Sequence, residues 1–305
     1  MKYLDVRAAR HVYGDGIHDD TKALQDALDK MKSGGTVYFP DGVYLISAAL
    51  IFYSNQWLKF SDRAVLRRSD KSENITHYML AAYSEPNVGG YEGTHDVVIS
   101  GGVFDGNENL TENLTVINTV HCNNIVIKNC SFVHGANWHY IELNSTSDAS
   151  VLDCVFDGRS YTAVRENLTS ELVQLDAADE NCYGPVYDWR GALIDFKLDR
   201  TPCRNVSIAS CIFKCAGSTA IGHHGDHAHE NIDIIYNVFD GVSGIGDFSR
   251  GYIYFMPQVK NVNISDNAFF SSAEEDAPNI TFAVNNPDPD ALKTEGNAYY
   301  GAFSD

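Results

Sequence analysis

The sequence has few positive charges and no long apolar run. Its 305 residues include 22 lysines and arginines against 41 aspartates and glutamates, which gives a formal net charge of −19 at pH 7. Such a surface repels nucleic acid and anionic membranes, so we expect neither as a partner. No hydrophobic stretch is long enough to span a bilayer, and residues 1–30 carry no secretion signal. We therefore expect either a cytoplasmic protein or a trimmed, secreted one.

Cysteine is scarce, and its count of seven is odd. Three cysteines fall at the same place in the repeats described below, which predicts small, buried thiols: Cys130, Cys154 and Cys211. Cys182 and Cys203 flank a long insertion and are the pair that we would expect to form a disulfide. A reducing compartment, or an anaerobic secreted setting, fits this cysteine usage.

A short pattern recurs along most of the chain. It has a polar start, apolar or β-branched residues at alternate positions, and then a phenylalanine. The phenylalanines are Phe104, Phe132, Phe156, Phe213, Phe239 and Phe269. They lie roughly 24 to 30 residues apart, except for a step of roughly 57 that holds two turns, or one turn and an insertion. Alternation with a period of two predicts strands, so we expect stacked coils of β-structure.

Residues 1–47 are predicted to form an N-terminal cap and the first strands. Asp19 or Asp20 can cap a helix that starts near Thr21 and has one apolar face. A helix laid over the first coil would cover a sheet edge that otherwise invites aggregation. Because the repeats are regular, we expect residues 1–305 to form a single elongated domain.

The segment GDGIHDDTKALQDALDKMKSGGTVYFPDGVYLIS, residues 14–47, resembles the N-terminal segment of the pectin-lyase-like proteins. The phenylalanine repeat is similar to the same superfamily over nearly the whole chain. The resemblance implies an all-β fold, a right-handed parallel β-helix with an N-terminal capping helix. The superfamily includes the family 28 polygalacturonases, other glycosidases, lyases, epimerases and phage or adhesin fibres. It therefore implies a fold and leaves the reaction open.

A second short strand follows each phenylalanine, and residues at equal positions of neighbouring coils should stack about 4.8 Å apart. The strands align on inward apolar residues, namely Ile141, Val173, Ile221 and Ile253. Two outward columns follow from this alignment: Glu142, Gln174, Gly222 and Tyr254 form the first, and Asn144, Asp176, His224 and Met256 the second. His223 falls at an inward position, and a shift of one residue would exchange it with His224.

Hydrolysis of a glycosidic bond needs one protonated carboxyl group and one ionised carboxylate. Glu142 and Asp176 lie diagonally on the predicted face, about 8 Å apart. This separation falls in the range of about 6.5–9.5 Å that is typical of inverting enzymes. We predict Asp176 as the general acid and Glu142, or a carboxylate of the insertion, as the base. His224, or His223 after a shift, would tune Asp176 or stabilise the transition state.

The insertion at residues 177–203 interrupts the repeat, and loops of this length are usually functional or disordered. We predict that it forms one wall of a sugar-binding cleft, where aromatic rings stack on sugars and arginines bind carboxylates or hydroxyls. The predicted substrate-binding residues come from the insertion and the outward columns: Tyr183, Trp189, Arg190, Arg200, Asn144, Gln174 and Tyr254. A plain surface loop is the alternative interpretation.

The segment GHHGDHAH, residues 222–229, is similar to the Gly-His-Gly element of the polygalacturonases, with His223 and His224 in its place. By the same resemblance, Asp176 matches the aspartate of their Asn-Thr-Asp element, although Gln174 precedes it here. Their adjacent Asp-Asp pair and their Arg-x-Lys element have no counterpart. The resemblance therefore does not imply pectin as the substrate.

Three other interpretations stay open. His227 and His229 alternate on one strand and could bind zinc or copper, although no further ligand has suitable spacing. A polysaccharide lyase would bind Ca²⁺ through carboxylates around Asp176, namely Asp179 and Glu180 beside it, and would use Arg190 or Arg200 as the base. A uronate epimerase is the alternative to the lyase. A non-catalytic carbohydrate-binding fibre or adhesin would use the same fold without turnover.

The main prediction is a glycoside hydrolase that acts on a poly- or oligosaccharide in a groove on the β-helix face. It would need no cofactor unless it is a calcium-assisted lyase. The last residues, LKTEGNAYYGAFSD, contain no helix to close the stack. We therefore expect a second subunit of a homo-oligomer, or an additional domain, to cover this end. A secreted form would be of bacterial or phage origin.

Overall fold

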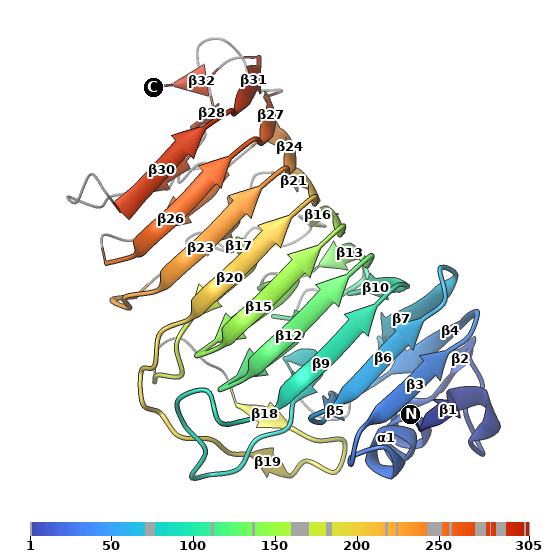
Figure 1. Cartoon of the computed structure of the whole chain (residues 1–305). Helices are drawn as coiled ribbons and strands as arrows, with labels where there is room; N and C mark the ends of the chain where they lie inside the picture. The colour runs from blue at the N-terminus through green and yellow to red at the C-terminus, as the bar shows by residue number, and fades with distance from the viewer. Residues whose placement is uncertain are drawn as a thin grey trace.

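The chain winds into a stack of β-coils. The computed structural model describes residues 2–70, 77–110, 113–135, 138–159, 171–180, 185–216, 219–223, 225–242, 252–255, 258–271, 279–280, 282–284, 291–301 and 303–304. The two termini lie at opposite ends of the stack (Figure 1). Three parallel sheets run along its length, which confirms the predicted parallel β-helix.

In the described residues, eight coils contribute one strand to each of the three sheets, and the first and last coils contribute strands to sheets A and B only. Sheet A contains, in order, β1 (Tyr3–Asp5), β3 (Gly35–Phe39), β6 (Gln56–Phe60), β9 (His95–Ser100), β12 (Asn123–Lys128), β15 (Ser147–Leu152), β20 (Arg204–Ala209), β23 (Glu230–Ile235), β26 (Lys260–Ser265) and β30 (Leu292–Glu295). Sheet B contains β2 (Asp15–Asp19), β4 (Gly42–Ile46), β7 (Ala64–Arg68), β10 (Val103–Asp105), β13 (Ser131–Gly135), β16 (Val155–Arg159), β21 (Ile212–Ala216), β24 (Val238–Val242), β27 (Ala268–Ser271) and β31 (Ala298–Tyr300). Sheet C contains β5 (Leu50–Phe52), β8 (Tyr78–Ala82), β11 (Thr115–Val120), β14 (Ile141–Asn144), β17 (Glu171–Asp176), β22 (Thr219–Gly222), β25 (Ile253–Phe255) and β29 (Phe282–Val284).

Two short strand pairs lie outside these sheets. They are β18 (Val186–Tyr187) with β19 (Leu193–Ile194), and β28 (Asn279–Ile280) with β32 (Phe303–Ser304). Figure 1 shows β18 and β19 near β5 and α1, although they follow β17 in the sequence. The insertion therefore reaches back along the stack toward the N-terminal coils.

The repeated phenylalanines form one column in the interior. Their rings stack with centroids 4.6 to 5.3 Å apart: Phe104, Phe132, Phe156, Phe213, Phe239 and Phe269. Phe156 pairs directly with Phe213, so the long step in the repeat is one coil plus an insertion. Tyr299 extends the column, 5.4 Å from Phe269. The C-terminal segment thus forms a further coil, β30 and β31, that the sequence analysis did not predict.

The predicted capping helix is present. Helix α1 (Thr21–Lys30) follows a 3-10 turn, η1 (Val6–Ala8), and buries Leu24 and Leu28. Asp19 accepts a hydrogen bond from the Thr21 backbone N–H at 2.8 Å, whereas Asp20 accepts bonds from residues before the helix. Asp20 is therefore the N-cap residue without a side-chain cap bond, and Asp19 satisfies the first helical N–H instead. No helix in the described parts of the chain is long and apolar enough to cross a membrane.

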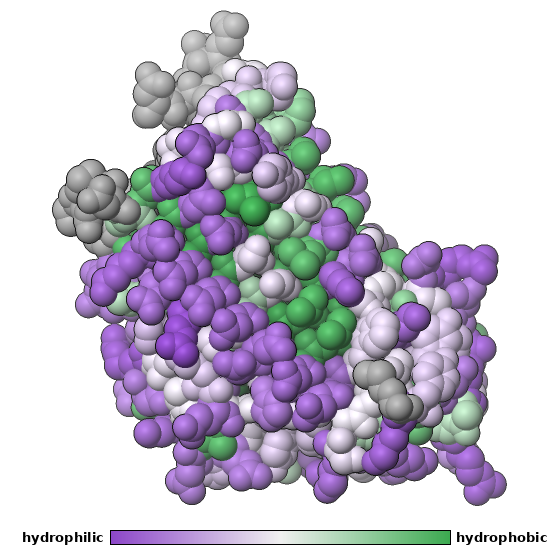
Figure 2. Space-filling model, viewed as in Figure 1, coloured by the Kyte–Doolittle hydropathy of each residue, from purple (hydrophilic) through white to green (hydrophobic). Residues whose placement is uncertain are grey.

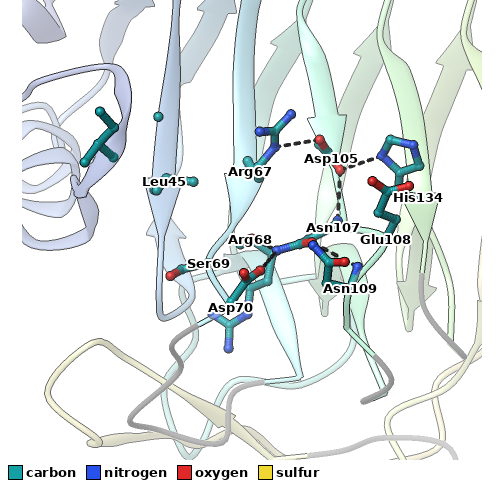
Figure 3. Close-up of a pocket in the computed structure, with 12 residues that line it drawn as sticks. Leu45, Arg67, Arg68, Ser69, Asp70, Asp105, Asn107, Glu108, Asn109 and His134 are labelled. Carbon is teal, nitrogen blue, oxygen red and sulfur yellow. Dashed lines mark hydrogen bonds and ion pairs between the residues drawn. The ribbon is translucent and has the colours of Figure 1, made fainter.

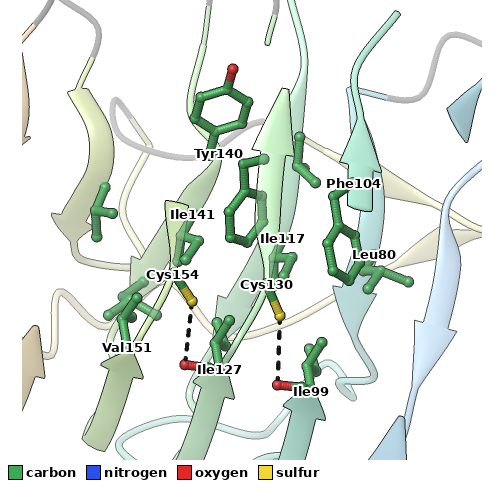
Figure 4. Packing of buried hydrophobic residues seen from close by; sticks show 14 of the residues in the cluster. Leu80, Ile99, Phe104, Ile117, Ile127, Cys130, Tyr140, Ile141, Val151 and Cys154 are labelled. Atoms are coloured by element: carbon green, nitrogen blue, oxygen red, sulfur yellow. Dashed lines mark hydrogen bonds between the residues drawn. The ribbon is translucent and has the colours of Figure 1, made fainter. Parts of the chain in front are cut away.

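The cysteine ladder is buried, as predicted. Cys130 and Cys154 point the same way in neighbouring coils, toward the carbonyls of Ile99 and Ile127, and Cys211 is buried with them (Figure 4). Cys203 is also a buried free thiol that donates to the Leu143 carbonyl at 3.1 Å. The expected bond to Cys182 is therefore not formed at Cys203, and Cys182 itself lies outside the described residues.

Candidate functional site

The two outward columns on sheet C have the predicted register. Glu142 pairs with Gln174, which pairs with Gly222 and then Tyr254. In the second column Asn144 pairs with Asp176. The repeat alone determined this alignment because side chains of a strand alternate between its two faces. His224, the next residue of the second column, lies outside the described residues.

The exposure of these columns was predicted wrongly. We expected an open groove, but Glu142, Asn144, Gln174 and Asp176 are all at most 3% exposed. Tyr254 is the partly exposed residue among the described members of the columns. The fold therefore places the predicted acid and base on neighbouring strands, and both side chains are buried in it.

Glu142 is held in a polar, water-excluded pocket. Thr115 donates to one carboxyl oxygen at 3.1 Å, and Asn144 donates to the other at 3.0 Å. Burial raises the pKa of Glu142 to about 7, and the hydrogen bonds from Asn144, Thr115 and Asn118 oppose this rise only in part. A protonated carboxyl at neutral pH is the state that a general acid requires.

Asp176 belongs to a separate network on the next coil. Gln174 donates to one of its carboxyl oxygens at 3.0 Å, and the Ala177 backbone N–H donates to the other at 2.8 Å. His227 lies 3.8 Å from Asp176 and 3.2 Å from Asp179. Burial lowers the pKa of His227, while the charge of Asp179 opposes that effect.

His223 occupies the inward position that the alignment gave it. It is fully buried, and its ring lies 5.5 Å from Phe255 and 4.7 Å from His229. His229 accepts a hydrogen bond from the Cys203 backbone N–H at 2.8 Å, and burial lowers its pKa well below the usual range. In the part of the chain that the structure describes, no group of three or more His, Cys, Asp or Glu residues is placed to bind a metal ion.

Residues 186–194 of the insertion pack on the N-terminal coils. Val186 contacts the outward face of sheet C at Ile51 and Ala81. Trp189 lies beneath the ammonium group of Lys22 on helix α1, at 5.4 Å. Trp189, which we predicted to stack on a sugar, therefore packs against helix α1. Tyr183 lies outside the described residues.

The arginines of the insertion are held by carboxylates of the same segment. Arg190 binds Asp188 through two nitrogens at 2.7 and 2.9 Å. Arg200 pairs with Asp179 at 3.2 Å, and its backbone N–H bonds to Ala178. The structure therefore gives both arginines a role in fixing the insertion, while their predicted contact with a sugar stays a prediction.

The second half of the insertion crosses the C-terminal ends of the sheet C strands. His121 bonds the carbonyls of Gly90 and Lys197 at 2.8 and 2.7 Å. Asp199 accepts a hydrogen bond from the Gly90 backbone N–H at 2.8 Å, and Ser145 donates to the Thr201 carbonyl at 2.7 Å. These bonds fasten two loops, from different coils, over the strand ends that carry Asn144 and Asp176.

A second polar cluster, which the sequence analysis missed, lies on the outward face of sheet B. Asp105 accepts hydrogen bonds from Arg67 at 2.7 Å, His134 at 2.9 Å and the Asn107 backbone N–H at 2.9 Å (Figure 3). These residues line a hollow of about 330 Å³. The sequence signal that could have predicted this cluster is the aspartate that follows Phe104, Phe156 and Phe239 in the repeat, because it indicates an outward polar column on this sheet.

The chain is similar to known β-helix proteins. The curated plasmin and fibronectin-binding protein A of Streptococcus pneumoniae is 28% identical over 269 residues, which cover 78% of this chain and 36% of that protein. This chain thus spans about a third of that relative. The crystal structure of PfbA, a surface adhesin of S. pneumoniae, superposes with a TM-score of 0.74 and 22% identity, over 100% of this chain and 67% of that one.

An enzyme structure shares the fold at lower similarity. The exopolygalacturonase from Thermotoga maritima has a TM-score of 0.54 and 13% identity, over 99% of this chain and 78% of that one. At such identities the structures show the fold alone. The model of the family described as rhamnogalacturonase A/epimerase, pectate lyase-like, matches residues 8–174, more than half of the sequence, and the chain belongs to this family.

Proposed function

We propose that this protein is a non-catalytic, carbohydrate-binding β-helix of the adhesin type. The observation that carries the proposal is the burial of Asp176 and Glu142, the two carboxyl groups that the repeat places together on sheet C. A glycosidase needs its two carboxyl groups to flank the scissile bond, one within reach of the leaving oxygen and the other within reach of the sugar or the attacking water. Here each one is bonded to its neighbours within the fold, which suits a structural role.

The relatives support the same proposal. The S. pneumoniae protein that matches 78% of this chain is named for binding plasmin and fibronectin, and the PfbA structure is described as a surface adhesin. Plasmin and fibronectin are therefore proposed partners to test beside carbohydrates. Figure 2 shows the face of sheet A as hydrophilic around an apolar area, and surfaces of this kind often contact other molecules.

A glycoside hydrolase is the second candidate. It is favoured by the fold, which hydrolases and lyases share, and by the pKa of Glu142, which burial raises to about 7. Glu142 would be the protonated group and Asp176 the ionised one, the reverse of the roles predicted from sequence. This function requires access to both carboxyl groups, so loops of the insertion would have to move away.

One experiment separates the two candidates. The purified chain is incubated with a panel of poly- and oligosaccharides while binding, new reducing ends and unsaturated uronates are measured, with plasmin and fibronectin in a parallel binding assay. We expect binding without product, and Asp176→Asn should bind as the wild-type chain does. Product formation that Asp176→Asn lowers by about 10² or more, the usual effect of losing an acid–base group, would establish the hydrolase instead.

A further inference from the structure

The hollow on sheet B has features of a built site. It lies across β4, β7, β10 and β13, with Leu45, Arg67 and Asp105 aligned in register in successive coils. Asp105 is 4% exposed, whereas the side chains of Arg67 and His134 are 42% and 45% exposed. The buried carboxylate therefore fixes two side chains that reach solvent, and Figure 3 shows them on either side of it.

The bonds to Asp105 determine which atoms remain for a ligand. Arg67 uses its Nε, so its two terminal nitrogens keep N–H donors for a ligand. His134 uses Nδ1, which leaves Nε2 as an acceptor when the ring is neutral. A donor and an acceptor on either side of Asp105 can hold two hydroxyl groups of a glycan, one accepting from Arg67 and the other donating to His134.

The charges around the hollow select against an anionic ligand. Arg67 and Arg68 face three carboxylates, Asp70, Asp105 and Glu108, so the formal charge of the lining is negative when His134 is neutral. Asp70 bonds the side chain of Asn107 on the neighbouring coil. A uronate or a sulfated sugar would meet these carboxylates, whereas a hydroxyl group of a neutral sugar can donate to the exposed Glu108.

The size of the hollow and the residues at its edge agree with a sugar ligand. A hollow of about 330 Å³ is at the lower end of ligand pockets, which run from about 300 to 1,000 Å³. Ile17 is 78% exposed at the rim and offers an apolar surface to the C–H face of a ring. Glu108 and Asn109 follow β10, three coils from Ile17 on β2, and are exposed there, where they add further polar atoms.

We infer that this hollow, on sheet B and away from the buried carboxyl groups of sheet C, binds a neutral glycan through hydroxyl groups held by Arg67 and His134. The inference rests on the proposed carbohydrate-binding function and gives it a place and a ligand class. Asp105 is a positioning residue: it orients Arg67 and His134 and does not itself contact the sugar.

The test uses the full chain and titration calorimetry with neutral manno-, xylo- and cello-oligosaccharides, and with oligogalacturonate as the acidic probe. Arg67→Ala and His134→Ala should each weaken binding of the best neutral probe at least about tenfold, the usual effect of losing a hydrogen bond to a charged or polar anchor. Glu108→Gln tests the site without touching Asp105, and we expect a loss of about threefold or more. Urea unfolding of each variant identifies any that fail to fold.

Lys214→Ala is the matched control. Lys214 pairs with Asp157 at 3.2 Å on the same face of sheet B, further along the stack, and both are half exposed. We expect its affinity to equal that of the wild-type chain. If Arg67→Ala, His134→Ala and Glu108→Gln all bind as the wild-type chain does, the proposed site is overturned. The proposed carbohydrate-binding function would still stand. Tighter binding of oligogalacturonate would overturn the ligand class, and a wild-type chain that binds no glycan would overturn the proposed function itself.

Discussion

Glu142 makes the stability of this protein depend on pH in a way that can be measured. Its carboxyl group is 3% exposed and accepts hydrogen bonds from Thr115 and Asn144. Burial raises its pKa from 4.5 to about 7. The folded chain therefore holds a proton on Glu142 between these two pH values, and the unfolded chain does not.

The sign and size of the effect follow from linkage. Where the folded state binds more protons than the unfolded state, the free energy of unfolding falls as the pH rises. The loss begins near pH 4.5, the ordinary pKa of a glutamate, and is complete above about pH 7. At about 1.4 kcal/mol for each unit of pKa, it amounts to about 3 kcal/mol. Glu142→Gln keeps the shape and the acceptor of the side chain but cannot ionise, so it should remove this loss.

The assay is urea unfolding of wild type and Glu142→Gln between pH 5 and pH 8. We expect the two chains to differ little at pH 5, and the variant to be more stable by about 3 kcal/mol at pH 8. Glu92→Gln, which removes an exposed carboxylate, is the control and should follow the wild-type curve. Parallel curves for wild type and Glu142→Gln would refute the reasoning, because they would show that Glu142 ionises equally in both states.

Two further changes test the interior column and the loops over sheet C. Phe156 stacks between Phe132 and Phe213, with ring centroids 4.9 and 4.6 Å away. Phe156→Ala should therefore lower the free energy of unfolding, measured in urea, by about 3–5 kcal/mol. A loss below about 1 kcal/mol would mean that the coil closes around the gap. Asp199→Ala removes the acceptor for the Gly90 backbone N–H and should speed hydrogen exchange at that amide and in the second half of the insertion, while the global unfolding midpoint changes little. Unchanged exchange there would show that other bonds hold the two loops together.

The comparison of the two carboxylate columns shows where sequence reasoning stops. The alignment correctly placed Glu142 beside Gln174 and Asn144 beside Asp176 because both lie in a repeat of fixed period. The alignment did not predict the hollow at Arg67. This hollow depends on contacts among Arg67, Asp105 and His134, which come from three coils and share no sequence motif. The alignment also missed the last coil, since Tyr299 takes the place that phenylalanine has elsewhere.

The sequence by itself determined the solenoid, its register and the face to which each strand residue points. The physical reason is local: side chains alternate along a strand, and the interior accepts the same apolar residues in every coil. Only the tertiary structure decided which outward residues meet solvent. That outcome depends on segments outside the repeat, such as the insertion that bonds to Gly90 and Ser145, and no periodicity in the sequence encodes where such segments come to rest.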